Sequence, residues 1–127
     1  MSPWQRSLLA GLAGFVVYGG WAYYVNMRYG TMIGLRSGLL QGSYSLVLTF
    51  VTTLLMERLY DRFAGLYARR VATIAVTGAL LFATPCLIHR LAGTPEILMT
   101  VLPGFLIGMV YTSVYVFSLA RLRAEMP

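Results

Sequence analysis

Charged side chains are scarce in this chain and make up 11% of its 127 residues, whereas soluble domains carry roughly 25%. Lysine is absent, so arginine supplies all ten basic residues, against four acidic ones. Hydrophobic residues make up 58% of the chain. This balance argues against a soluble globular fold and favours a protein that lies in a membrane.

The residues that carry most enzyme and metal chemistry are nearly missing. Cys86 is the only cysteine, so it forms no disulfide within the chain, and His89 is the only histidine. Four acidic residues and one histidine do not supply the clustered ligands of a metal site. The sequence also lacks a nucleophile elbow, a phosphate-binding glycine loop and paired carboxylates within its apolar runs. We therefore expect neither an enzyme nor a cofactor.

Four long runs contain no Asp, Glu, Lys or Arg: residues 7–25, 38–56, 71–88 and 97–119. A hydrocarbon core of ~30 Å is crossed by about 20 apolar residues of helix. The runs predict an all-α membrane protein with four transmembrane helices in a compact bundle, forming a single domain over residues 1–127. Trp21, Tyr23 and Tyr24, near the end of the first run, are typical of a membrane interface.

The arginines are distributed unequally between the two sides of this arrangement. One side holds Arg6, Arg58, Arg62, Arg69, Arg70, Arg121 and Arg123, and the other holds Arg28, Arg36 and Arg90. Because short cytoplasmic links are enriched in basic residues, both termini are expected in the cytoplasm. The use of arginine alone suggests a GC-rich bacterial genome, and hence a bacterial inner (plasma) membrane. Charges confined to span ends also argue against nucleic acid as a partner.

The second run is polarised around the helix axis. At 100° per residue, small and polar side chains share one sector, and leucine, valine and phenylalanine fill the rest of the circumference. The sector contains Gly38, Gln41, Gly42, Ser45, Thr49, Thr52 and Thr53. Together with Gly34, the glycines form a ladder at intervals of four residues, which favours close helix packing in membranes.

The fourth run repeats this pattern, so we expect the second and fourth helices to face each other or a shared centre. The predicted substrate-binding seam between them consists of Gln41, Ser45, Thr49, Thr52, Thr100, Tyr111 and Tyr115. The predicted packing glycines are Gly34, Gly38, Gly42, Gly104 and Gly108.

The outer links carry a second group of candidates. Arg36, His89, Arg90 and Glu96 lie in or beside these links. They are expected to form an outer mouth at which an arginine meets an anionic lipid headgroup.

The two halves of the chain show weak similarity in two competing registers. A shift of 63 residues pairs Gly30-Thr31 with Gly93-Thr94, whereas a shift of 66 pairs Gly38 with Gly104 and Gly42 with Gly108. Either register would make the chain a 2+2 parallel repeat of a two-helix unit.

Two functions follow from these patterns and remain open at this point. The first is a membrane protein that handles a lipid or lipid-linked molecule through the seam. The absence of charge within the spans argues against coupling to protons or cations. The second is a non-catalytic accessory or assembly subunit of a larger membrane complex. Besides the lipid bilayer, the expected partners are other copies of the chain or a larger membrane protein.

Overall fold

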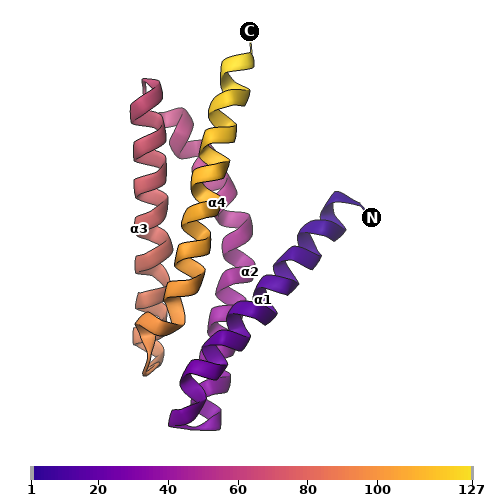
Figure 1. Cartoon of the computed structure of the whole chain (residues 1–127), viewed down its shortest axis with the longest axis vertical. Coiled ribbons are helices and arrows are strands. Elements are labelled where there is room, and N and C mark those ends of the chain that lie inside the picture. The colour runs from indigo at the N-terminus through magenta and orange to yellow at the C-terminus, as the bar shows by residue number, and fades with distance from the viewer. Residues whose placement is uncertain (1, 127) are drawn as a thin grey trace.

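The computed structural model describes residues 2–126, with the side chains of Ser2, Gln5 and residues 8–126. These residues form α1 (Pro3–Asn26), the short 3-10 helix η1 (Met27–Tyr29), α2 (Thr31–Arg62), α3 (Leu66–Ala92) and α4 (Ile97–Glu125) (Figure 1). No strand is present in the described part of the chain. The Arg6 side chain, which entered the charge comparison above, lies outside the described side chains.

All four helices are long and apolar enough to cross a membrane, which confirms the four predicted spans. The helices extend beyond the apolar runs, since α2 begins at Thr31 and continues to Arg62. Backbone groups near a membrane are best satisfied by internal hydrogen bonds, so helices continue into the polar flanks. The links between the helices are therefore shorter than the apolar runs indicated. Residues 63–65 join α2 to α3, residues 93–96 join α3 to α4, and η1 with Gly30 joins α1 to α2.

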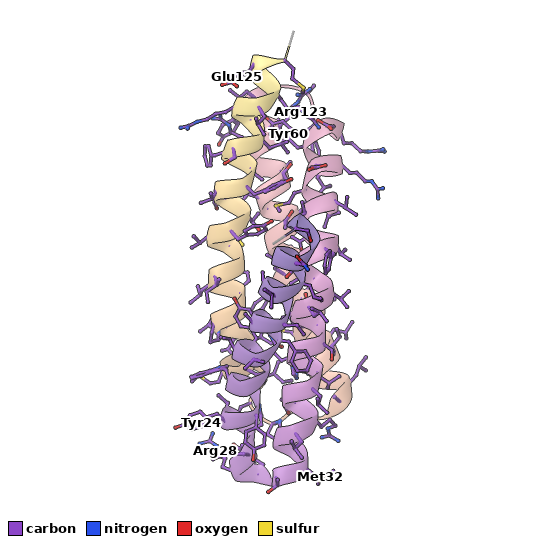
Figure 2. The ribbon with its side chains drawn as sticks, turned by 90° about the vertical axis from the view of Figure 1, so that its right-hand side faces the viewer. Tyr24, Arg28, Met32, Tyr60, Arg123 and Glu125 are labelled. Carbon is purple, nitrogen blue, oxygen red and sulfur yellow. The ribbon has the colours of Figure 1, made fainter. Side chains whose placement is uncertain are left out.

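We call the end of the molecule that carries residues 27–30 and 93–96 the two-link end. The opposite end, where α4 finishes beside residues 63–65, is called the terminal end. Figure 2 shows Arg28 at the two-link end and Arg123 and Glu125 at the terminal end. The charges thus lie at both ends of the helices, as expected for segments with an apolar middle.

The α3–α4 link is closed by a glycine cap. Gly93 has a φ of 73°, in the left-handed region that glycine adopts without strain. Its N–H donates to the Arg90 carbonyl at 3.2 Å, and the Thr94 N–H donates to the His89 carbonyl at 2.9 Å. This pair of bonds is a Schellman motif. It fixes Thr94 directly beside His89 at the two-link end.

The helices pack as two hairpins, α1 with α2 and α3 with α4. Contacts of α4 with α1 and α2 are fewer, and α1 leans away from the other helices toward its N-terminal end (Figure 1). A hydrophobic core at the terminal end joins α2 to α4 and contains Met56, Tyr60, Val116, Leu119 and Ala120. Four helices are thus present, but α1 joins the others only along part of its length.

The glycine ladder of α2 packs against α1, whereas the sequence pattern suggested α4. An ideal Cβ on Gly38 would lie 2.9 Å from the Gly19 carbonyl oxygen, and one on Gly42 would lie 2.9 Å from the Phe15 carbonyl oxygen. Gly34 approaches Met27 and Tyr23 in the same way. The missing side chains let the two backbones come together. A regular spacing of small residues indicates close helix packing, but it does not identify which helix is the neighbour.

We expect Gly38→Ala to destabilise the protein because the added Cβ would press on the α1 backbone. Gly20→Ala is the matched control, since nothing lies within 4 Å of a Cβ at that position. Reversible unfolding in mixed micelles should give a free energy about 1–3 kcal/mol lower for Gly38→Ala than for Gly20→Ala. Equal stability of the two variants would contradict the close α1–α2 contact.

Candidate functional site

A cavity of about 440 Å³ lies between α1, α2 and α4, with Leu81 and Pro85 of α3 in its wall. It contains five members of the predicted seam, whereas Thr100 and Tyr115 lie outside its lining. Its polar side chains are Tyr18, Gln41, Tyr44, Ser45, Thr49, Thr52 and Tyr111, and none of its lining residues is charged. Most of the wall is therefore apolar, with a few polar groups contributed mainly by α2.

Small residues and the lean of α1 create this space. Ala10, Ala13 and Gly14 line it from α1, and Gly104 and Gly108 line it from α4. An ideal Cβ on Gly104 would meet Gln41 Nε2 at 3.5 Å and Tyr18 at 3.7 Å, which are ordinary contacts. Gly104 thus borders open space, whereas Gly108 also packs on Leu81 of α3. These two predicted packing glycines both face the cavity.

The cavity is open between α1 and α4. Val17 of α1 and Ile107 of α4 both line it and are 62% and 54% exposed. Thr49 and Tyr111 are likewise exposed. These residues belong to the apolar middle of helices that are long and apolar enough to cross a membrane.

The hydroxyl groups along α2 are mostly satisfied within that helix. Ser45 donates to the Gln41 carbonyl at 2.8 Å, Thr49 to the Ser45 carbonyl at 3.0 Å and Thr52 to the Leu48 carbonyl at 2.6 Å. Such bonds to the preceding turn are common for hydroxyl residues in membrane helices. These side chains can therefore line an apolar cavity without leaving a donor unpaired.

Gln41 belongs to a buried polar cluster at the two-link end of the cavity. His89 Nε2 lies 2.7 Å from Gln41 Oε1, and His89 Nδ1 lies 2.8 Å from Thr94 Oγ1. Ser37 completes the cluster by donating to Thr94 Oγ1 at 3.4 Å. Gln41, His89 and Thr94 are 3%, 1% and 4% exposed. His89 therefore couples α3 to α2 instead of facing an open mouth.

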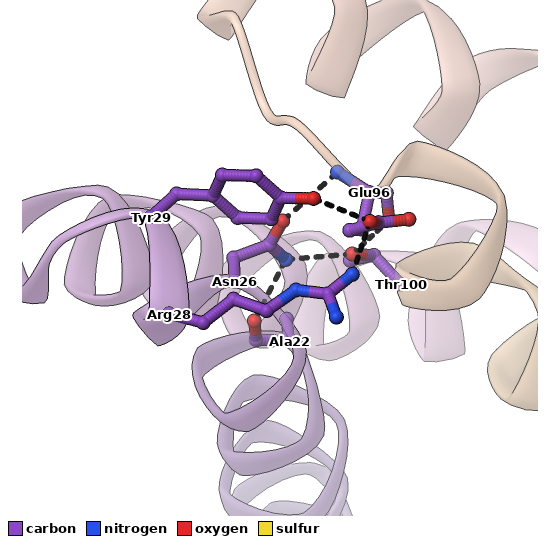
Figure 3. A network of polar contacts seen from close by, with 6 residues as sticks. All are labelled: Ala22, Asn26, Arg28, Tyr29, Glu96 and Thr100. Atoms are coloured by element: carbon purple, nitrogen blue, oxygen red, sulfur yellow. Dashed lines mark hydrogen bonds and ion pairs between the residues drawn. The ribbon is translucent and has the colours of Figure 1, made fainter.

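A second buried cluster joins the end of α1 to the start of α4 (Figure 3). Asn26 Nδ2 donates to Thr100 Oγ1 at 2.7 Å and to the Ala22 carbonyl at 2.8 Å. Asn26 Oδ1 accepts from the Glu96 backbone N–H at 3.1 Å. Asn26 thus satisfies a donor that α4 leaves free where it begins.

Glu96 is held at the surface of this cluster (Figure 3). The Tyr29 hydroxyl donates to Glu96 Oε1 at 2.6 Å, and Arg28 forms an ion pair with the same oxygen. These two partners hold the pKa of Glu96 below its ordinary value, because both favour the carboxylate. Of the four predicted mouth residues, Arg36 and Arg90 are the exposed cations.

The Trp21 side chain joins α1 to α4 near the two-link end. Pro103 has no N–H, so the Met99 carbonyl one turn earlier lacks its helical donor. The Trp21 indole N–H donates to this carbonyl at 2.7 Å. The carbonyl that Pro103 leaves without a helical donor is thus satisfied by Trp21, which ties α1 to α4.

Tyr115 makes its contact nearer the terminal end. Its hydroxyl donates to Glu57 at 2.6 Å, and Asp61 pairs with Arg123 at 2.9 Å in the same α2–α4 contact. The hydroxyls of Thr53 and Tyr111 lie 3.0 Å apart. Part of the expected α2–α4 seam is therefore present there.

Among residues 2–126, no three His, Cys, Asp or Glu side chains gather where they could hold a metal ion.

Asn26, Ser37 and Thr94 were not among the site residues predicted from the sequence. Asn26 is the only asparagine and ends an apolar run, which is a detectable signal because a primary amide next to hydrocarbon needs partners. Ser37 and Thr94 carry no comparable signal. Their role depends on the Schellman motif and on the close approach of α2 and α3.

The Trp21–Met99 bond predicts a specific coupling between two substitutions. Trp21→Phe should lower the free energy of unfolding by about 0.5–1.5 kcal/mol. In a Pro103→Ala background, the restored backbone N–H satisfies Met99, so the same change should cost less. A double-mutant cycle measured in mixed micelles tests this expectation. The same cost in both backgrounds would exclude the proposed bond.

Comparisons with protein-family models, curated proteins and solved structures give no match to this chain.

Proposed function

We propose that this protein binds a lipid or lipid-linked molecule without chemically changing it, and that the hydrocarbon chain of the ligand occupies the cavity between α1, α2 and α4. The observation that supports this most directly is an apolar cavity of about 440 Å³ that opens between two helices at the depth of the bilayer hydrocarbon. Small-molecule sites typically measure 300–1,000 Å³ and combine apolar walls with a few polar groups.

The position of the opening favours a ligand that arrives from the membrane. At the two-link end, Trp21 and Asn26 tie α1 to α4. Farther along, α1 leans away, and lining residues such as Val17 and Ile107 are exposed. Molecules with hydrocarbon chains are the ones available at this depth. An uncharged lining also disfavours small ions, which need charged or carbonyl ligands in the membrane.

We propose that α1 approaches α4 when the hydrocarbon chain of the ligand fills the cavity, so that the occupied protein forms a compact four-helix bundle. The structure supports this through the attachment of α1 to α4 at one end only. A ligand chain between the helices would supply the van der Waals contacts that drive helix association in lipid.

We also propose a 2+2 parallel repeat in the register of 63 residues. This register pairs Asn26 with His89, and both are buried polar residues near the end of the first helix of a hairpin. Each contacts the second helix of the other hairpin, because Asn26 reaches Thr100 and His89 reaches Gln41. The register of 66 pairs Gly38 with Gly104, which have different surroundings.

The unequal arginine distribution supports a place in a bacterial inner membrane with both termini in the cytoplasm. A reporter that is active only in the cytoplasm should work when fused to either terminus, and a periplasmic reporter at residues 93–96 should work as well. The opposite pattern would reverse the orientation proposed for the chain.

An accessory role is the second candidate, and exposed polar groups favour it. Thr49 and Tyr111 border the opening, and Tyr111 is 45% exposed. A helix from a larger membrane protein or from a second copy could cover them. Purification in mild detergent separates the two functions, since a stoichiometric lipid supports the first and a stoichiometric protein chain supports the second.

Filling the cavity should release the lipid. Gly104→Phe would place an aromatic ring in the open space beside Tyr18 and Gln41. We expect it to lower lipid retention about tenfold, which corresponds to about 1.4 kcal/mol. Gly20→Phe is the matched control, because this exposed α1 glycine has no neighbour within 4 Å of its Cβ position. Native mass spectrometry measures retention, and equal retention by both variants would refute the cavity as the binding site.

A further inference from the structure

We propose that the Gln41 carboxamide is the ligand-recognition donor of the cavity, and that it binds the ester carbonyl oxygen of an acylated lipid. His89 is the positioning residue that turns the amide N–H₂ group toward the ligand. This inference rests on the lipid-binding function proposed above and names the chemical group that the site recognises.

The first observation is an amide donor on the cavity side that has no partner among the described residues. Gln41 is 3% exposed and lines the cavity. Its Oε1 lies beside His89, but its Nε2 forms no hydrogen bond with any described residue. Nε2 lies on the cavity side, where an ideal Cβ on Gly104 would be 3.5 Å away. A ligand acceptor at this point would therefore pair a donor that the described residues leave free, which is favourable.

The second observation is the hydrogen-bond chain that fixes the amide. Ser37 donates to Thr94 Oγ1, which leaves the Thr94 hydroxyl proton for His89 Nδ1. His89 Nε2 then carries the imidazole proton and donates it to Gln41 Oε1. All the hydrogen bonds in this series therefore donate in the same direction, from Ser37 toward Gln41, and the Gln41 N–H₂ group is left at the cavity. The Schellman motif of the α3–α4 link holds His89 and Thr94 at the required positions.

The third observation concerns which acceptor suits the site. None of the lining residues is charged, so a phosphate would lose its hydration without gaining a cation. A neutral carbonyl oxygen needs only a neutral donor. Gln41 lies three residues into the apolar run that starts at Gly38, or about 5 Å along the helix. This depth is close to the membrane surface, where the ester groups of lipids lie.

The remaining cavity accommodates the acyl chain of such a lipid. Along α2 the lining continues from Gln41 to Thr52, a distance of about 16 Å at 1.5 Å per residue. Over this length the hydroxyls of Ser45, Thr49 and Thr52 donate to their own helix, whereas the buried Tyr44 hydroxyl has no hydrogen-bond partner among the described residues. Gln41 is thus the amide donor at the two-link end of this path, and Tyr44 is a second lining residue with an unpaired donor.

The experiment compares two phosphatidylcholines with equal chain lengths, one with ester-linked and one with ether-linked chains. The ether lipid lacks the carbonyl oxygens but has the same headgroup. Native mass spectrometry of the full chain gives the ratio of the two affinities. We expect the wild-type protein to prefer the ester lipid about fivefold, which is about 1 kcal/mol and one neutral hydrogen bond. Gln41→Leu should remove this preference.

A second pair of variants tests the positioning role of His89 without altering Gln41. Thr94→Val removes the hydroxyl that donates to His89 Nδ1, whereas Thr94→Ser retains it. We expect Thr94→Val to reduce the ester preference and Thr94→Ser to keep it. Nitrogen-15 NMR of the imidazole should show the proton on Nε2 in the wild-type protein and in Thr94→Ser, and a changed proton distribution in Thr94→Val.

The outcomes separate the inference from the function on which it rests. Equal binding of ester and ether lipids by the wild-type protein would overturn the role of Gln41 while leaving lipid binding intact. An ester preference that persists in Gln41→Leu and Thr94→Val would do the same. If neither lipid binds, or if Gly104→Phe retains both as well as Gly20→Phe does, the proposed function fails and the inference fails with it.

Discussion

The attachment of α1 to α4 at one end only is the constraint on which the rest of the structure depends. At the two-link end, Trp21 satisfies the carbonyl that Pro103 leaves free, and Asn26 satisfies the start of α4. In its middle, α1 keeps its contact with α2 through Phe15 and Gly42, and toward its N-terminus it leans away from the other helices (Figure 1). The cavity is the consequence, since it occupies the space that a fully closed bundle would fill.

The same end of the molecule concentrates the polar groups that a membrane interior tolerates only when they are paired. Asn26 and His89 each carry bonds between hairpins. Their clusters therefore serve to hold the two hairpins in register, and the hydrophobic core around Met56 and Val116 joins α2 to α4 at the other end. Between these two fixed regions, the wall of the cavity is mostly apolar.

The sequence predicted the four spans well, because the length of each run without charged residues matches the thickness of the hydrocarbon core. It also identified five cavity residues from Gln41 to Tyr111, since a polar sector on an otherwise apolar helix must avoid lipid. It did not predict that Gly38 and Gly42 face α1, because glycine spacing allows close packing against any helix. Asn26 with Thr100 and His89 with Gln41 are pairs distant in sequence. Their contacts depend on the tertiary arrangement, which no local pattern specifies.

Access of lipid chains to the cavity is the central claim, and two valines of α4 test it directly. Val101 and Val116 are 1% and 0% exposed, but only Val101 lines the cavity. In perdeuterated protein with protonated valine methyls, placed in bilayer discs, nuclear Overhauser effects report contact between lipid chains and each methyl group. The account predicts strong effects from lipid methylenes to Val101 and none to Val116. Effects absent from both valines, but present at lipid-facing residues such as Val16, would contradict it.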